Sequence, residues 1–388
     1  MTTPRPRTRA DSSQASDALP NATAVFGGAA EDRRRAALVL QAECRSAFES
    51  GQEVKGWKDS RNRINKLADR MRQDFVDRDR AINGILAALI SRAGCVLLGP
   101  PGTAKSLLVN RIAKECDLRI GTEDANYFEY LLTAHTMPEE IFGPTDIGQL
   151  LQDPPQVQRR TEARLPHAEL AFLDEVFRGG SHILNTLLTI LNERKFHNGR
   201  TIEEVPLVSF IGAANFPPQT DELKAFFDRF PVRIWVDSVL KVSGSKLVEH
   251  GSRLISADSK SVASNETATN RPSMGDFRRL WSILRLKMSV SESDSTRGGG
   301  QSQRLQEFTR NFKAFQEEGR LSDRSFVQLW YFAGALDMVD GRDPEKSFAQ
   351  GGSGHFECFA YVAPSTESLG RIQHHLKSIM ARQSASGA

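Results

Sequence analysis

The stretch that most constrains this chain is a glycine-containing loop, Gly99-Pro-Pro-Gly-Thr-Ala-Lys-Ser106. It follows the apolar run Cys95–Leu98 and precedes Leu107–Cys116, which can form a helix. A strand, a loop of this kind and a helix, in that order, are the context of a phosphate-binding loop. Backbone N–H groups of the loop and the N-terminus of the helix point at phosphate oxygens. The sequence therefore predicts a nucleotide site built into an α/β fold.

Individual positions of the loop have separate physical roles. Glycine at 99 and 102 allows backbone angles and close approach that a side chain would block. Lys105 is predicted to reach the β- and γ-phosphates, and the Ser106 hydroxyl to ligate Mg²⁺. At Ala104 the general motif has glycine, and an alanine is tolerated there if its φ is helical. The residues predicted to bind ATP here are Gly99, Pro100, Pro101, Gly102, Thr103, Ala104, Lys105, Ser106 and Leu107.

Polar side chains follow two later apolar runs. Asp174 and Glu175 end the run that begins at Leu170, and Asn215 follows Leu207–Ala214. In open parallel sheets, ligands bind at the carboxyl ends of the strands. Asp174 is predicted to hold Mg²⁺, and Glu175 to deprotonate the attacking water, help worth about 10²–10⁴-fold. Asn215 is predicted to hydrogen-bond the γ-phosphate or that water. Taken alone, an Asn before Phe-Pro-Pro is more often a turn residue, so this assignment depends on the phosphate loop and the acid pair.

Arg229 lies just before the last apolar run. An arginine finger stabilises the charge of a phosphoryl-transfer transition state and contributes about 10³–10⁵-fold. A salt bridge with Asp228 or Asp221 is the alternative, and the sequence leaves both open. Arg324, at the start of a predicted helix near the C-terminus, has the same ambiguity.

Five apolar runs alternate with helical segments, which predicts a parallel sheet covered on both faces. The runs are Cys95–Leu98, Tyr127–Leu132, Leu170–Leu173, Leu207–Ala214 and Val232–Val236. We predict five parts: a disordered tail (1–30), a helical extension (31–73), an αβα nucleotide-binding domain (74–240), a linker (241–272) and a helical lid (273–388).

Composition narrows the functional class. The net charge is +3, and there is no long basic stripe, so a nucleic-acid partner is not expected. The four cysteines form no CxxC pair, which argues against a zinc site or a disulfide framework. The sequence shows neither a secretory signal nor a membrane-spanning run, and we expect a cytoplasmic protein.

Four longer motifs carry a family resemblance. They are GPPGTAKSLL at 99–108, PEEIFGP at 138–144, FLDEVFRGGSHILNTLLTILNERKFHNG at 172–199 and LSDR at 321–324. With them the chain resembles the MoxR family of AAA+ ATPases, most closely its RavA subgroup, in which Ala104 is a usual residue. The resemblance weakens after about residue 237, and the stretch 241–272 has no clear counterpart.

The resemblance implies a P-loop NTPase core with a five-stranded parallel sheet, a small helical lid and a ring, usually hexameric. It places Asn215 at the sensor-1 position, Arg229 at the arginine finger and Arg324 at the sensor-2 arginine. Val76 falls where the family packs a residue on adenine. Arg233 is a second, weaker candidate for the finger.

A hairpin is predicted after the amphipathic segment Ser181–Glu193. Asn198-Gly199 is a strong hairpin signal, because a type I′ turn requires φ > 0 at both positions. Our hypothesis is that the hairpin helps to grip a partner polypeptide; a plain solvated hairpin is equally open. The residues concerned are Lys195, Phe196, His197 and Arg200.

The function expected first is a chaperone-like ATPase that remodels or activates a partner protein. The resemblance implies a von Willebrand factor A domain partner. The alternative is a nucleic-acid motor or helicase loader. A GTPase is disfavoured because the one NKxD-like stretch, Asn65–Asp69, has the wrong spacing and precedes the loop. A scaffold without turnover is disfavoured by the intact Lys105, Asp174 and Glu175.

Overall fold

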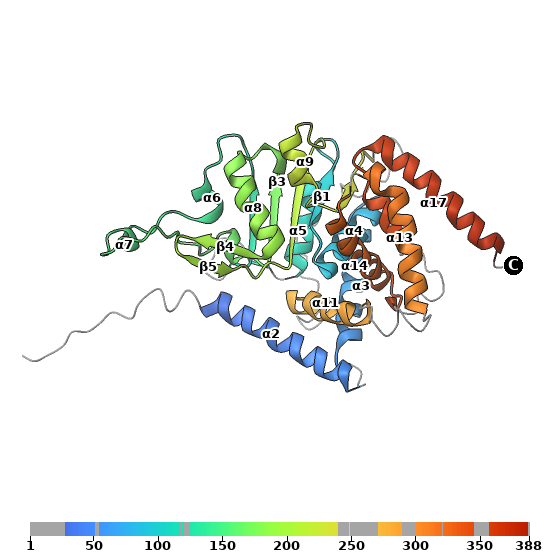
Figure 1. The fold of residues 1–388 in the computed structure, drawn as a ribbon, viewed down its shortest axis with the longest axis horizontal. Helices are drawn as coiled ribbons and strands as arrows, with labels where there is room; N and C mark the ends of the chain where they lie inside the picture. The colour runs from blue at the N-terminus through green and yellow to red at the C-terminus, as the bar shows by residue number, and fades with distance from the viewer. Residues whose placement is uncertain are drawn as a thin grey trace, which may run out of the picture.

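The computed structural model describes residues 28–50, 54–116, 118–119, 125–239, 248, 271–288, 300–319, 321–344 and 357–386 (Figure 1). The predicted tail and the predicted linker therefore lie almost wholly outside the described residues. The last three residues of that tail are described, and they are helical, because helix α2 begins at Gly28.

The centre of the molecule is a five-stranded sheet in which every neighbouring pair is parallel. The strand order is β2-β3-β6-β1-β7, and this confirms the predicted α/β fold class. The strands are β1 (Cys95–Leu98), β2 (Tyr127–Leu131), β3 (Leu170–Asp174), β6 (Ser209–Ala214) and β7 (Val232–Trp235). Below, the carboxyl edge is the side of the sheet where these strands end, and the amino edge is where they begin.

Helices surround the sheet and extend beyond it on one side. The described ones include α2 (Gly28–Glu49), α3 (Trp57–Asp74), α4 (Asp79–Ser91), α5 (Lys105–Glu115), α6 (Pro138–Phe142), α7 (Ile147–Leu150), α8 (Ser181–Glu193), α9 (Asp221–Phe227), α11 (Met274–Met288), α13 (Gly300–Gly319), α14 (Asp323–Val339) and α17 (Thr366–Ser386). Short 3₁₀ turns are η1 (Leu165–His167), η2 (Val176–Arg178) and η4 (Cys358–Tyr361). Among the described helices, none combines the length and apolar composition needed to cross a bilayer.

The sheet separates two apolar cores. Alternate residues of a strand face opposite sides, so Cys95 and Leu97 pack with α4 and α5, whereas Val96 and Leu98 pack with α8 and α9. Because both faces of the sheet are covered, the strands are mostly apolar, which is why they could be located as apolar runs. Glu129 in β2 and Arg233 in β7 are exceptions.

Helix α14 packs against α4, and the 3₁₀ turn η4 contacts strand β7. Figure 1 shows α13, α14 and α17 on the same side of the molecule as α4. Helix α14 lies against α4 with opposite polarity: Asn83, near the start of α4, donates to Asp340, just past the end of α14, at 3.2 Å. Arg233 of β7 is fully buried and donates to the carbonyls of Gly319 and Val362. These bonds attach the helical part to the edge strand of the sheet.

The predicted hairpin is present as β4 (Lys195–Asn198) and β5 (Thr201–Glu204). Its turn differs from the prediction, because φ is positive at Gly199 (63°) but not at Asn198. The two-residue loop is Gly199-Arg200, and glycine at its first position is the pattern of a type II′ turn. The Asn198 side chain is buried instead, and it binds the backbone of Arg159 on a neighbouring segment.

Candidate functional site

The phosphate loop joins β1 to α5 at the carboxyl edge of the sheet. Gly99 has φ 151°, and a Cβ there would lie 2.2 Å from the carbonyl oxygen of Val236, so only glycine fits. The tip at Pro100, Pro101 and Gly102 is exposed. Leu107, on the first turn of α5, is 53% exposed.

Ala104 does not have the helical φ under which an alanine is easily tolerated at this position. Its φ is 68° and its ψ 23°, which is left-handed backbone, and it is the residue from which α5 starts. The chain has to turn sharply out of the loop and into the helix at this point. For a residue with a Cβ, this conformation costs about 1–2 kcal/mol. Ala104, which replaces the glycine of the general motif, therefore has a strained backbone conformation.

Lys105 is buried beneath the loop, with 7% of its surface exposed. Its Nζ donates to the carbonyls of Gly99 and Pro100 at 2.8 and 2.9 Å, and to Oδ1 of Asn215 at 3.3 Å. Burial lowers the pKa of Lys105, and the carboxylates of Asp174 and Glu175 act in the opposite direction. The ammonium group thus lies inside the cradle where phosphate oxygens could replace the carbonyls.

Ser106 and Asp174 are 68 residues apart in the chain and meet at the carboxyl edge. The Ser106 hydroxyl donates to Oδ2 of Asp174 at 2.7 Å, and Oδ1 of Asp174 accepts from the backbone N–H of Glu175 at 2.9 Å. A hydroxyl and a carboxylate are oxygen ligands of the kind that Mg²⁺ takes, together with water and phosphate. The two side chains therefore fit the predicted metal.

Glu175 is held from two sides. Nδ2 of Asn215 donates to its Oε1, and Nε of Arg178 pairs with its Oε2 at 3.2 Å. Because Asn215 also accepts from Lys105, it connects the phosphate loop to the acid pair. Arg178 was not among the residues predicted from the sequence. Its position three residues after Glu175 could have suggested an ion pair, because residues three apart on a helical turn are neighbours.

Val76 lies half-buried in the turn between α3 and α4. Two residues later, Arg78 donates from Nη2 to the carbonyls of Thr103 and Asp237, at 3.3 and 2.8 Å. Burial lowers the pKa of Arg78. This arginine, which sequence reasoning also missed, joins the turn that carries Val76 to the phosphate loop.

Arg229 lies at the amino edge. Its carbonyl lies against Gly94, the residue before β1, and its Nη1 pairs with Asp228 at 2.9 Å. The four residues of β1, at about 3.3 Å each, separate that edge from the phosphate loop. Arg229 is therefore far from the phosphate loop of its own chain, and within the chain it forms the salt bridge that was the alternative expectation.

Arg324 lies on the same side as Arg229. Its Nη1 donates to Oδ1 of Asn192, near the end of α8, at 2.7 Å. Helix α8 begins shortly after the acid pair, at the carboxyl edge, and is about 20 Å long. Its last turn, which contains Asn192, therefore lies toward the amino edge. Arg324 is thus also remote from the phosphate loop of its own chain, because α14 runs opposite to α4.

Arg233, the weaker finger candidate, is not a finger in this structure. It has 0% exposure, donates to Gly319 and Val362 as described above, and lies 4.2 Å from the centre of the Phe227 ring. The burial of Arg233 could not be predicted from its position in the sequence, because the carbonyls that it binds belong to the distant C-terminal part.

Comparisons with known sequences identify relatives over about half of the chain. Protein MJ0812 of Methanocaldococcus jannaschii is 42% identical over 187 residues, which are 48% of each chain. MJ0079 of the same organism is 44% identical over 172 residues, 44% of this chain and 43% of the relative. Both are named only as uncharacterized proteins. Structural protein ORF618 of Acidianus two-tailed virus is 30% identical over 179 residues, 44% of this chain and 28% of the relative. The chain thus spans about half the length, or less, of the curated relatives it matches.

A solved structure shares the fold. A protein of Cytophaga hutchinsonii, described as a "putative ATPase", superposes with a TM-score of 0.56 at 18% identity, covering 87% of this chain and 97% of that one. At this identity the likeness concerns the fold alone.

The family model for the MoxR domain of MoxR-vWA-beta-propeller ternary systems matches residues 62–271, which is more than half of the 388 residues. That range contains the phosphate loop, the acid pair and Asn215. The chain therefore belongs to the MoxR family of AAA+ ATPases.

Proposed function

We propose that this chain binds ATP with Mg²⁺, hydrolyses it to ADP and phosphate, and uses the energy to remodel, assemble or activate a partner protein. One observation carries the proposal: Lys105, Ser106, Asp174, Glu175 and Asn215 form a continuous set of contacts at the carboxyl edge. A single triphosphate placed on the loop would touch all of them.

The side chains divide the chemistry among them. Lys105 would bind the β- and γ-phosphates, and Ser106 and Asp174 would hold Mg²⁺, which neutralises phosphate charge when bound. Glu175 would accept a proton from water as the water oxygen bonds to the γ-phosphorus. The bond from that phosphorus to the bridging oxygen breaks, and ADP leaves. Asn215 would orient Glu175 and the water.

The positions of the two remote arginines support a ring of identical subunits, six in the usual family pattern. Arg229 and Arg324 both lie near the amino edge, away from the phosphate loop of the same chain. In a ring, one subunit would present this edge to the nucleotide of its neighbour, where Arg229 would act as the finger and Arg324 as the sensor-2 arginine. Val76 would pack on the adenine within its own subunit.

The proposed partner is a protein with a von Willebrand factor A domain. The matched family is described as part of ternary systems with vWA and β-propeller components, and this supports such a partner. The RavA-like subgroup remains a prediction from the sequence motifs.

Two variants test the chemistry. Lys105→Ala should abolish heat of ATP binding in calorimetry, because the charge that meets the phosphates is gone. Glu175→Gln should bind ATP normally yet hydrolyse it about 10²–10⁴-fold more slowly. Glu204→Gln, the same change at an exposed position of β5, is the matched control and should leave turnover unchanged. Turnover at the wild-type rate in Glu175→Gln would refute the mechanism.

A further inference from the structure

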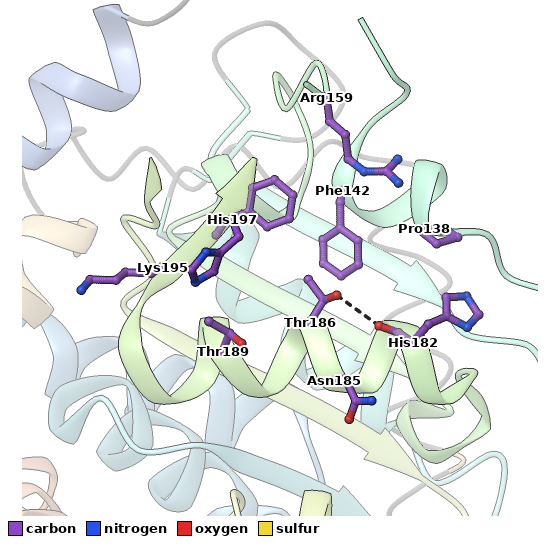
Figure 2. A pocket seen from close by; sticks show the side chains of 10 residues that line it. Pro138, Phe142, Arg159, His182, Asn185, Thr186, Thr189, Lys195 and His197 are labelled. Atoms are coloured by element: carbon purple, nitrogen blue, oxygen red, sulfur yellow. Dashed lines mark hydrogen bonds between the residues drawn. The ribbon is translucent and has the colours of Figure 1, made fainter. Parts of the chain in front are cut away.

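A cleft of about 410 Å³ opens between α6, α8 and β4 (Figure 2), and no residue of the phosphate loop lines it. One wall is the polar stripe of α8 that contains His182, Asn185 and Thr189. In Figure 2, His197 of the hairpin lies over this stripe near Thr189, and Lys195 lies at the left end of the cleft with its side chain directed outward. The cleft is therefore lined by α8 and β4, which follow the acid pair in the chain, and by α6 and Arg159, which precede it.

The floor of the cleft is aromatic. Phe142 of α6 and Phe196 of β4 stack with ring centres 5.5 Å apart and are 2% and 3% exposed. Phe196 is thus part of the apolar core, and the hypothesis that it grips a partner from the hairpin surface is wrong. Its buried ring instead fixes the depth of the cleft and gives it an apolar base.

The rim of the cleft is basic. Arg159, His182, Lys195 and His197 line it, and none of the described residues that line it is acidic. Glu139, outside the lining, pairs with Arg159 at 3.1 Å. Lys195 is exposed and forms no ion pair with any described residue. Positive charge at the rim is therefore only partly compensated within the chain.

We propose that this cleft docks an extended acidic segment of the partner protein. Carboxylates of the segment would face Lys195 and Arg159 at the rim, and one apolar side chain would pack toward the Phe142–Phe196 floor. The inference rests on the proposed function, in that it supposes a partner protein, and it specifies the chemistry of that partner. Charge complementarity selects an acidic segment over a basic or neutral one.

The cleft is connected to the catalytic edge by one short segment. His182 is on the first turn of α8, and Arg178, which pairs with Glu175, is four residues earlier. A partner that binds against the start of α8 therefore contacts an element that directly follows the acid pair. This connection provides a path by which docking can alter hydrolysis.

The test is fluorescence anisotropy without nucleotide, using a fluorescein-labelled peptide of alternating Glu and Leu. The same peptide with Lys in place of Glu is the charge control. Lys195→Glu should weaken binding of the acidic peptide about fivefold or more, because an attraction becomes a repulsion. Thr189→Trp, which fills the cleft without changing charge, should weaken it as well.

Arg200→Glu is the matched control variant. Arg200 is exposed on the same hairpin but does not line the cleft, so the same charge change there should leave binding within twofold. Equal losses in Lys195→Glu and Arg200→Glu, or equal binding of the basic peptide, would overturn the proposal.

Other occupants give different results. If a second copy of this chain covers the cleft, Lys195→Glu should dissociate the oligomer in light scattering, whereas Arg200→Glu should not. If the cleft binds nucleic acid, labelled duplex DNA should bind and lose affinity in Lys195→Glu. Either result overturns the assignment to a protein segment.

Lys105→Ala should keep peptide binding, so failure of the ATPase proposal remains distinguishable from failure of this one.

Discussion

Two residues of the site have left-handed backbone although neither is glycine. Ala104 has φ 68° and Glu175 has φ 51°. Such conformations are uncommon and persist when the surrounding structure determines them. At Ala104 the backbone turns into α5, and at Glu175 it turns out of β3, so both positions set the direction of the groups around the nucleotide cradle.

Ala104→Gly should stabilise the protein. The change removes a left-handed cost of about 1–2 kcal/mol, and the greater freedom of glycine in the unfolded chain returns about 0.4–1 kcal/mol. We expect a net gain of about 0.5–1 kcal/mol in the free energy of unfolding, measured by urea denaturation. Ala104→Val should lose stability, because a β-branched side chain fits this conformation worse. A loss in Ala104→Gly would contradict the strain argument.

Arg178→Ala should lower kcat about two- to fivefold and leave KM for ATP unchanged. The ion pair with Glu175 is largely exposed on the arginine side, so its contribution lies in the range of about 0.2–1 kcal/mol. Arg178→Lys should restore part of the loss. Lys224→Ala removes a similar exposed pair, with Asp221, and should have no effect on steady-state kinetics. An unchanged kcat in Arg178→Ala would show that Arg178 does not position Glu175.

At the scale of elements, the hairpin and the segment 144–160 stabilise each other. Asn198 accepts from the Arg159 N–H at 2.6 Å and donates to the Arg159 carbonyl at 3.0 Å. A Cβ on Gly199 would lie 2.1 Å from the carbonyl oxygen of Val157. The Asn-Gly pair is therefore required for contact with a neighbouring segment as well as for the turn.

Asn198→Ala should destabilise the protein by about 1–3 kcal/mol, because it removes two hydrogen bonds between the buried Asn198 side chain and the part-buried backbone of Arg159. Asn185→Ala, on the exposed face of α8, should change stability by less than about 0.5 kcal/mol. Urea denaturation measures both. Cleavage within 144–160 by a protease should also become faster in Asn198→Ala only. Equal stability of the two variants would show that the contact is unimportant.

At the scale of the whole molecule, the helical C-terminal part is attached to α4 and β7, not placed over the phosphate loop. Trp235 donates from its indole N–H to the carbonyl of Ala363 at 3.0 Å, beside the buried Arg233. This arrangement puts Arg324 near the amino edge with Arg229. A single chain therefore contains a nucleotide cradle without either arginine.

A mixing experiment tests action between subunits. Arg229→Ala and Lys105→Ala should each be nearly inactive, but mixed rings should regain ATPase activity. In such rings, the intact cradle of an Arg229→Ala subunit can receive the arginine of a Lys105→Ala neighbour. A mixture of Lys105→Ala and Glu175→Gln is the control and should stay inactive, because both changes damage the cradle of their own subunit. No recovery in mixed rings would mean that Arg229 does not act on a neighbour.

The sheet, the phosphate loop and the acid pair could all be predicted before the structure was known. Strands buried on both faces are mostly apolar, and the phosphate cradle needs Gly99, Lys105 and Ser106 within one short stretch. The strands and the cradle can therefore be recognised from residues that are adjacent in the sequence. The meeting of Ser106 with Asp174 could also be predicted, because parallel strands end at a common edge.

The other features of the site could not be predicted, because they depend on packing between distant parts of the chain. The left-handed backbone of Ala104, the burial of Phe196 and Arg233, and the remote position of Arg324 depend on neighbours distant in the chain. An arginine has the same local sequence signal whether it faces a phosphate, a carbonyl or a carboxylate. Which of these it meets is set by how the helices pack, and that packing is a property of the whole fold.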